Sequence, residues 1–105
     1  RDPDATRRLV AGHFRGIDTF RAQPVRAAGV MRLRQGLAPE DIVKAFDGVR
    51  IPDITENRRM LGTSAGPPEV EVAAAKLVRI MLDNRLMQRP VTVAGLADDR
   101  FLPSP

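Results

Sequence analysis

The residues with the clearest chemical potential in this sequence are a single histidine, two adjacent carboxylates and a large set of arginines. His13 is the only histidine, and the 105 residues include no cysteine. Catalysis by metals, thiols or acid–base pairs needs several His, Cys, Asp or Glu side chains that converge on one point. No such spacing occurs, so the sequence predicts no catalytic residue, no metal site, no cofactor and no enzymatic activity.

The histidine and the carboxylate pair both have ordinary structural interpretations. His13 falls between Leu9 and Ile17 on an apolar helix face, which is typical of a packing histidine. Asp98 and Asp99 follow Gly95 near the end of the sequence, a position typical of a solvated turn. We therefore expect neither feature to act as a reactive group.

A glycine-rich stretch lies at residues 62–66 and could be mistaken for a phosphate-binding loop. It reads Gly-Thr-Ser-Ala-Gly but lacks the Lys-Ser/Thr pair that follows such a loop. Two prolines come next, at positions 67 and 68. We interpret residues 62–68 as a linker before the long last helix.

The charge is mildly basic and is carried almost entirely by arginine. Fifteen Arg and two Lys oppose thirteen Asp and Glu, which gives a net charge of +4 and a pI of about 10.9. This balance leaves open a small basic helical module that binds nucleic acid. However, the only aromatic residues are four Phe, so stacking platforms for bases are scarce. We do not expect nucleic acid to be the partner.

The elements that must position these residues are predicted to be helices. Prolines next to acidic residues mark three starts, at Pro3, Pro39 and Pro67-Pro68, because proline fits the first helical turn and carboxylates favour the positive end of the helix dipole. Apolar residues then recur at helical spacing. The sequence predicts an all-α segment of about five helices, near residues 3–23, 24–35, 39–47, 53–61 and 69–86.

The last of these helices has the widest apolar face. One face is predicted to carry Val70, Ala73, Ala74, Leu77, Ile80 and Met81, and Val78 and Leu82 widen it. We expect this helix to be the most buried element and to keep an apolar strip for a partner, so the isolated chain could self-associate. Leu77→Asp is then expected to disrupt folding and Lys76→Asp to cost little. The wide apolar face also leaves open a function as a protein-interaction domain.

The segment 51–61 carries the pattern D-x-x-x-N-x-x-x-L at Asp53, Asn57 and Leu61. The end of the chain carries L-x-D-x-x-F at Leu96, Asp98 and Phe101. Together with segments 9–17, 23–28 and 36–46, these five segments in order resemble the C-terminal third of the ABC-importer solute-binding proteins for nitrate, sulfonates, taurine and thiamine precursors, and 51–61 is the most distinctive of them. The likeness covers nearly all of residues 1–105, as a single helical C-terminal segment.

The resemblance implies a part of a two-lobed α/β periplasmic-binding-protein clamp that captures a small anionic or polar solute for an ABC permease. Asn57 and Arg58 are the implied solute-binding residues of this segment. The implied location is periplasmic, or extracellular and membrane-associated. Two departures stand out: Asn84-Arg85 replaces a glycine-containing turn, and no α/β portion precedes Arg1. Because the sequence starts without Met, we expect a processed product or a fragment.

Overall fold

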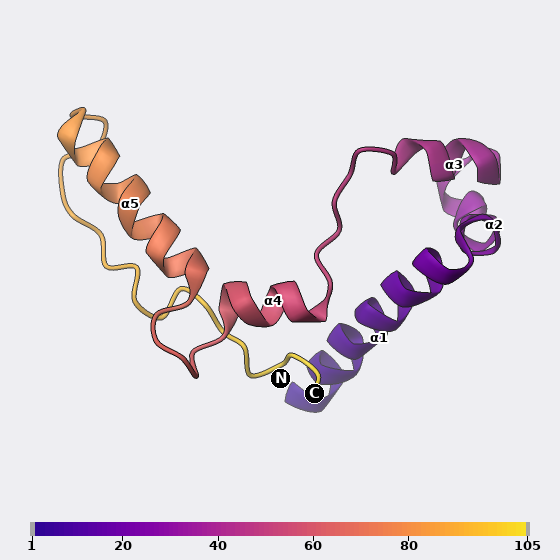
Figure 1. The fold of residues 1–105 in the computed structure, drawn as a ribbon, viewed down its shortest axis with the longest axis horizontal. Coiled ribbons are helices and arrows are strands. Elements are labelled where there is room, and N and C mark those ends of the chain that lie inside the picture. Colours follow the sequence, from indigo (N-terminus) through magenta and orange to yellow (C-terminus); the bar gives the residue numbers. More distant parts are fainter. Residues whose placement is uncertain (1, 105) are drawn as a thin grey trace. The chain divides into compact units, whose positions relative to one another are not determined.

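The computed structural model describes residues 2–104 as five α-helices with no strand among them. In order, they are α1 (Pro3–Ala22), α2 (Pro24–Gln35), α3 (Pro39–Ala45), α4 (Ile54–Leu61) and α5 (Glu69–Asp83) (Figure 1). The all-helical prediction is therefore confirmed for the described residues. They group into two compact units, residues 2–53 with 103–104 and residues 54–102. The predicted linker 62–68 lies inside the second unit, between α4 and α5.

The starts of the first three helices follow local rules that the sequence already contains. Asp2 caps α1, since its Oδ1 accepts hydrogen bonds from the backbone N–H groups of Asp4 and Ala5, both at 3.0 Å. Pro24 and Pro39 occupy the first positions of α2 and α3. Gly36 ends α2 in the left-handed conformation, with a φ of 66°. These starts and this end were predicted correctly.

The core of the first unit is small and lies where α2 and α3 follow the C-terminal part of α1. The buried apolar residues are Phe14 and Ile17 of α1, Ala28 of α2 and Ile42 of α3. Contact between α2 and α3 is the most extensive of the helix pairs, followed by that between α1 and α2. Leu9, expected on the buried face of α1, is instead exposed.

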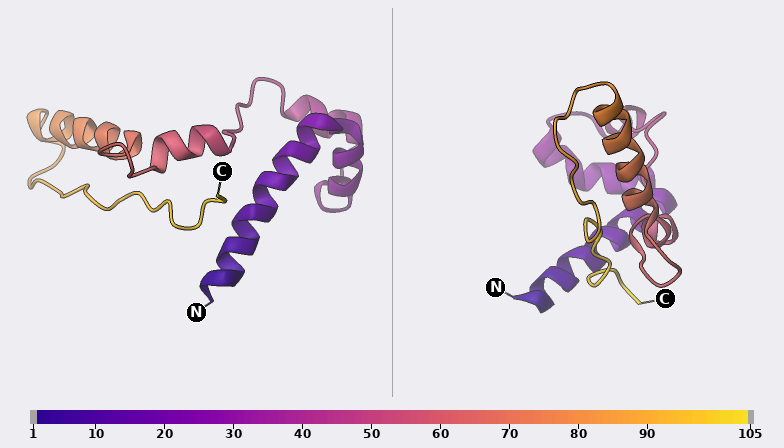
Figure 2. Two further views of the ribbon diagram at one scale, coloured as in Figure 1. Left: turned by 60° about the horizontal axis from the view of Figure 1, so that its bottom comes forward. Right: turned by 90° about the vertical axis from the view of Figure 1, so that its left-hand side faces the viewer.

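The second unit consists of α4, α5 and an extended segment that runs back along α5 (Figures 1 and 2). Neither helix has a buried residue. The prediction that α5 is the most buried element is therefore wrong: Leu77 is 57% exposed and Ile80 is 56% exposed. The half-buried apolar residues of α5 are Val70, Ala74, Val78, Met81 and Leu82.

The end of α5 differs in detail from the sequence prediction. The helix ends at Asp83 and not near Leu86. The left-handed residue of the turn is Arg85, with a φ of 57°, whereas Asn84 has a φ of −93°. The Leu86 N–H donates to the Met81 carbonyl at 2.8 Å, which closes the last turn.

Candidate functional site

The two predicted solute-binding residues are neighbours in the second half of α4. Asn57 and Arg58 are both half-buried. Both already take part in interactions within the chain, so neither side chain is without a partner. Whether they bind a solute stays a prediction, because consecutive helix positions point about 100° apart and do not by themselves form a pocket.

The end of α4 is held to the start of α5 by a charged pair and by a glycine. The Arg59 guanidinium Nε lies 3.3 Å from Oε1 of Glu69. The Gly62 N–H donates to the Arg58 carbonyl at 2.8 Å, and a Cβ at Gly62 would collide with that carbonyl oxygen. Glycine is therefore required at position 62, where the chain leaves α4 one turn after Arg58.

The two adjacent carboxylates, Asp98 and Asp99, accept hydrogen bonds from different partners. Both Asp98 oxygens accept from Arg100, at 2.9 Å from Nε to Oδ1 and 2.7 Å from Nη2 to Oδ2. This side-chain hydrogen bond, together with one from the Arg100 backbone N–H, lowers the pKa of Asp98 to about 2. Oδ2 of Asp99 instead accepts from the Thr63 N–H at 3.2 Å. The turn interpretation is supported, and the two carboxylates do not act together.

Glu71 has a role that the sequence analysis missed. Its Oε1 accepts from the backbone N–H groups of Gly95, at 2.9 Å, and Ala97, at 3.2 Å. These bonds fasten the returning segment to the first turn of α5. An acidic residue in a first turn is expected only to favour the helix dipole, so no local signal pointed to residues more than twenty positions away.

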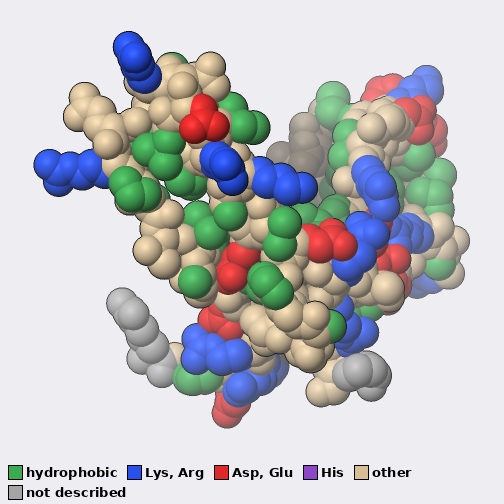
Figure 3. All heavy atoms as spheres, turned by 60° about the vertical axis from the view of Figure 1, so that its left-hand side comes forward, with side chains coloured by type: hydrophobic (Ala, Val, Ile, Leu, Met, Phe, Trp, Pro, Cys, Tyr) green, Lys and Arg blue, Asp and Glu red, His purple; other side chains and the backbone are tan. Residues whose placement is uncertain are grey.

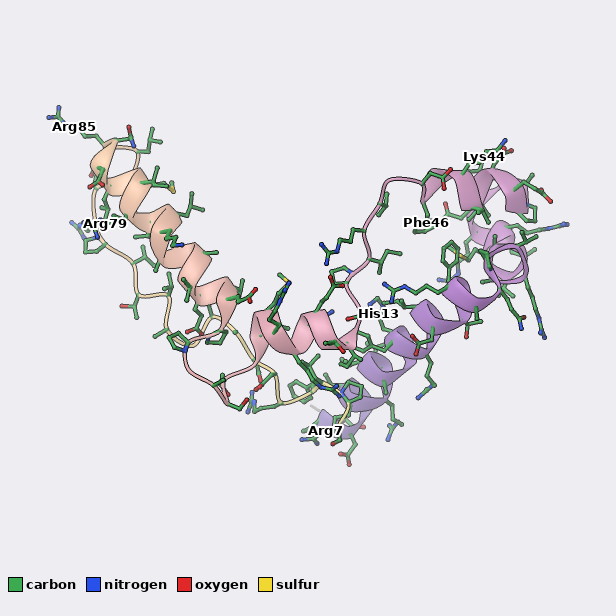
Figure 4. All side chains as sticks on the ribbon, in the orientation of Figure 1. Arg7, His13, Lys44, Phe46, Arg79 and Arg85 are labelled. Atoms are coloured by element: carbon green, nitrogen blue, oxygen red, sulfur yellow. The ribbon has the colours of Figure 1, made fainter. Side chains whose placement is uncertain are left out.

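An open apolar groove of about 470 Å³ lies within the first unit. Phe20 and Phe46 are among its lining residues, with ring centroids 4.8 Å apart, and Phe46 points from the end of α3 toward α1 (Figure 4). The Arg21 guanidinium positions the segment beside it, with 2.6 Å from Nη2 to the Ile51 carbonyl and 3.8 Å from Nη1 to Asp53. The full lining is His13, Gly16, Ile17, Thr19, Phe20, Ala27, Val30, Met31, Phe46 and Ile51.

His13 lies at this groove and is exposed. The prediction that it packs within the apolar face of its helix is therefore wrong. Its ring meets that of Phe14 edge to face, with centroids 5.3 Å apart. Within residues 2–104, no three His, Cys, Asp or Glu side chains are placed to hold a metal ion. The groove therefore offers apolar contact with one titratable group and no reactive cluster.

No helix in the described part of the chain combines the length and the apolar character that a membrane span requires. Comparison with protein families, with curated proteins and with solved structures finds no match for this chain.

Proposed function

We propose that this chain is the C-terminal helical part of the solute-binding component of an ABC importer of the nitrate, sulfonate and taurine type. The observation that carries the proposal is the agreement between the resembling segments and the helix boundaries. The segment 23–28 spans the start of α2, 36–46 spans all of α3, and 51–61 contains α4.

The uncovered apolar surface of α5 also supports the proposal. Leu77 and Ile80 are more than half exposed, and Figure 3 shows apolar side chains lying at the surface among charged ones. Clusters of exposed apolar residues usually mark a surface that contacts another domain or protein. In the proposed two-lobed α/β clamp, an upstream lobe would cover this strip.

In this proposal the solute is a small anion or polar molecule, bound between the lobes and released to an ABC permease. Asn57 and Arg58 contribute an amide and a guanidinium to the edge of that cleft, since both groups donate hydrogen bonds to oxyanions. The protein acts in the periplasm or at the outer cell surface. Its task is binding and delivery, without covalent chemistry.

The test is to express the complete reading frame that contains this sequence and to measure solute binding by calorimetry. The panel is nitrate, taurine, an alkanesulfonate and a thiamine pyrimidine precursor. We expect one of them to bind with one-to-one stoichiometry. Asn57→Ala and Arg58→Ala should weaken binding, whereas the control Arg59→Ala should not, because Arg59 is paired with Glu69. A start codon directly before Arg1, with no upstream α/β region, would contradict the proposal.

A second candidate is self-association through α5, which the exposure of Leu77 and Ile80 favours. Sedimentation equilibrium of the 105-residue chain distinguishes the two. A dimer that persists in the complete protein favours an interaction domain, and one that the upstream region abolishes favours the clamp.

A further inference from the structure

The first unit contains a long stretch with positive charge and no negative charge. Between Asp18 and Glu40 the sequence has no Asp or Glu but four arginines. One of them, Arg21, is occupied, because its guanidinium binds the Ile51 carbonyl and Asp53. The other three, at positions 26, 32 and 34, all lie on α2.

The side of α2 away from its buried residue carries two exposed apolar side chains with two arginines beside them. Ala28 is fully buried, whereas Val30 is 77% exposed and Leu33 is 88% exposed. Arg26, seven residues before Leu33, lies on the same side of the helix as Val30 and Leu33. Arg34, four residues after Val30, lies on this side as well, whereas Arg32, four residues after Ala28, lies on the side of the buried residue. We call Arg26, Val30, Leu33 and Arg34 the outer face of α2.

These arginines are not used in ion pairs within the described part of the chain. Arg26 donates to the neutral side chain of Gln23, at 3.0 Å, and no carboxylate of residues 2–104 lies at ion-pair distance from Arg26, Arg32 or Arg34. Burying the guanidinium groups of Arg26 and Arg34 inside a protein would require partners of opposite charge. The outer face of α2 therefore suits an anionic surface outside the protein better than an upstream lobe.

We propose that the outer face of α2 docks on the anionic lipid surface of a membrane. Val30 and Leu33 enter the boundary between headgroups and acyl chains, and the guanidinium groups of Arg26 and Arg34 stay at the level of the lipid phosphates. A nucleic acid would also attract the arginines, but its backbone offers no apolar contact for Val30 and Leu33. This proposal does not depend on the identity of any transported solute.

The decisive experiment measures partition of the full 105-residue chain onto vesicles by sedimentation. Vesicles of phosphatidylcholine with phosphatidylglycerol should bind it, and vesicles of phosphatidylcholine alone should not. The double variant Arg26→Gln, Arg34→Gln should lower the partition coefficient about twenty-five-fold, since each cation near an anionic surface contributes about a fivefold factor. Added salt should weaken binding by the unchanged chain.

A matched double variant controls for the loss of net charge. Arg79 and Arg85 are exposed residues of the second unit and point outward from the ribbon (Figure 4). Changing both to Gln removes the same charge but should lower partition much less. Equal losses in the two double variants would mean that net charge alone drives binding, which would overturn the proposal.

The apolar part of the face can be tested separately because the chain has no cysteine. A single Leu33→Cys, labelled with an environment-sensitive fluorophore, should show a blue shift on anionic vesicles, and a label at Leu77→Cys should not. Binding of duplex DNA without any shift on vesicles would refute lipid docking in favour of a nucleic acid. Circular dichroism checks that each variant keeps its helix content. The lipid-docking proposal would also be refuted if the unchanged chain did not bind anionic vesicles at low salt.

Discussion

Ile42 provides the sharpest test of the packing in the first unit. It lies on α3 and is only 2% exposed, at the place where α3 packs on α2. Ile42→Ala removes three carbon atoms, worth about 2.4 kcal/mol at about 0.8 kcal/mol each. The cavity left behind adds to this, so we expect a total loss of about 3–4 kcal/mol. Ile42→Val removes one carbon and should cost about 1 kcal/mol.

The size of the first unit decides which variant gives a clean measurement. At about 0.05–0.15 kcal/mol per residue, its free energy of unfolding would be only about 3–8 kcal/mol. Ile42→Ala could therefore unfold it entirely, with loss of the helical signal of α1 to α3. Ile42→Val should leave it folded with a lower urea midpoint. Far-ultraviolet circular dichroism during urea denaturation measures both effects.

Leu33→Ala is the matched control for this prediction. It also truncates an aliphatic side chain, but Leu33 is 88% exposed and should change the free energy of unfolding by no more than about 0.5 kcal/mol. If Ile42→Ala left the urea transition unchanged, or if Leu33→Ala cost as much as Ile42→Val, the packing of α2 on α3 would be wrong.

Five further substitutions probe individual interactions. Gly62→Ala should destabilise the chain by about 1–3 kcal/mol in urea denaturation, because its Cβ meets a backbone carbonyl, while Gly16→Ala, with open space around it, should stabilise α1 by about 0.5–1 kcal/mol. Glu71→Ala should lower the free energy of unfolding by about 1–2 kcal/mol and speed hydrogen exchange at the amides of Gly95 and Ala97. Unchanged exchange at these amides would contradict their hydrogen bonds to Glu71. Leu77→Asp should leave the helix content unchanged, since the Leu77 side chain is exposed. Loss of the helical circular dichroism signal would instead mean that Leu77 lies on a buried face of α5. The Asp98 carboxyl should titrate near pH 2 by NMR; its stabilising contribution should be present above the ordinary carboxyl pKa and lost as the pH falls toward 2, and replacing its arginine partner by Gln should raise the pKa.

The helix boundaries could be predicted because their causes are local. The Asp2 cap, the prolines at 24 and 39 and the left-handed Gly36 each act within a few residues of the boundary they set. The end of α5 was harder, since Asn84 and Arg85 both compete for the left-handed position and Arg85 takes it. Apolar spacing alone does not decide such a competition.

The covered face of α5 could not be predicted because it depends on distant residues. Glu71 binds the backbone at Gly95 and Ala97, so the returning segment packs near the side of the helix that this residue faces. The apolar arc of α5 is wider than this segment covers, and Leu77 remains outside. Helical periodicity identifies an apolar arc but not the part of it that a neighbour covers. Whether Asn57 and Arg58 bind a solute stays a prediction, because in the proposed clamp it would depend in the same way on residues of the other lobe.

The second unit is held mainly by polar contacts with the backbone and not by a packed core. Pro68 is its one buried residue among those described. Glu71 and Asp99 supply hydrogen bonds that contribute only about 1 kcal/mol each, whereas ordering a residue costs about 1–2 kcal/mol of backbone entropy. A unit with so little buried apolar surface needs an additional contact to remain ordered. The exposed side of α5 is one surface on which such a contact can form, which is the physical reason to look for an upstream lobe or a second copy against Leu77 and Ile80.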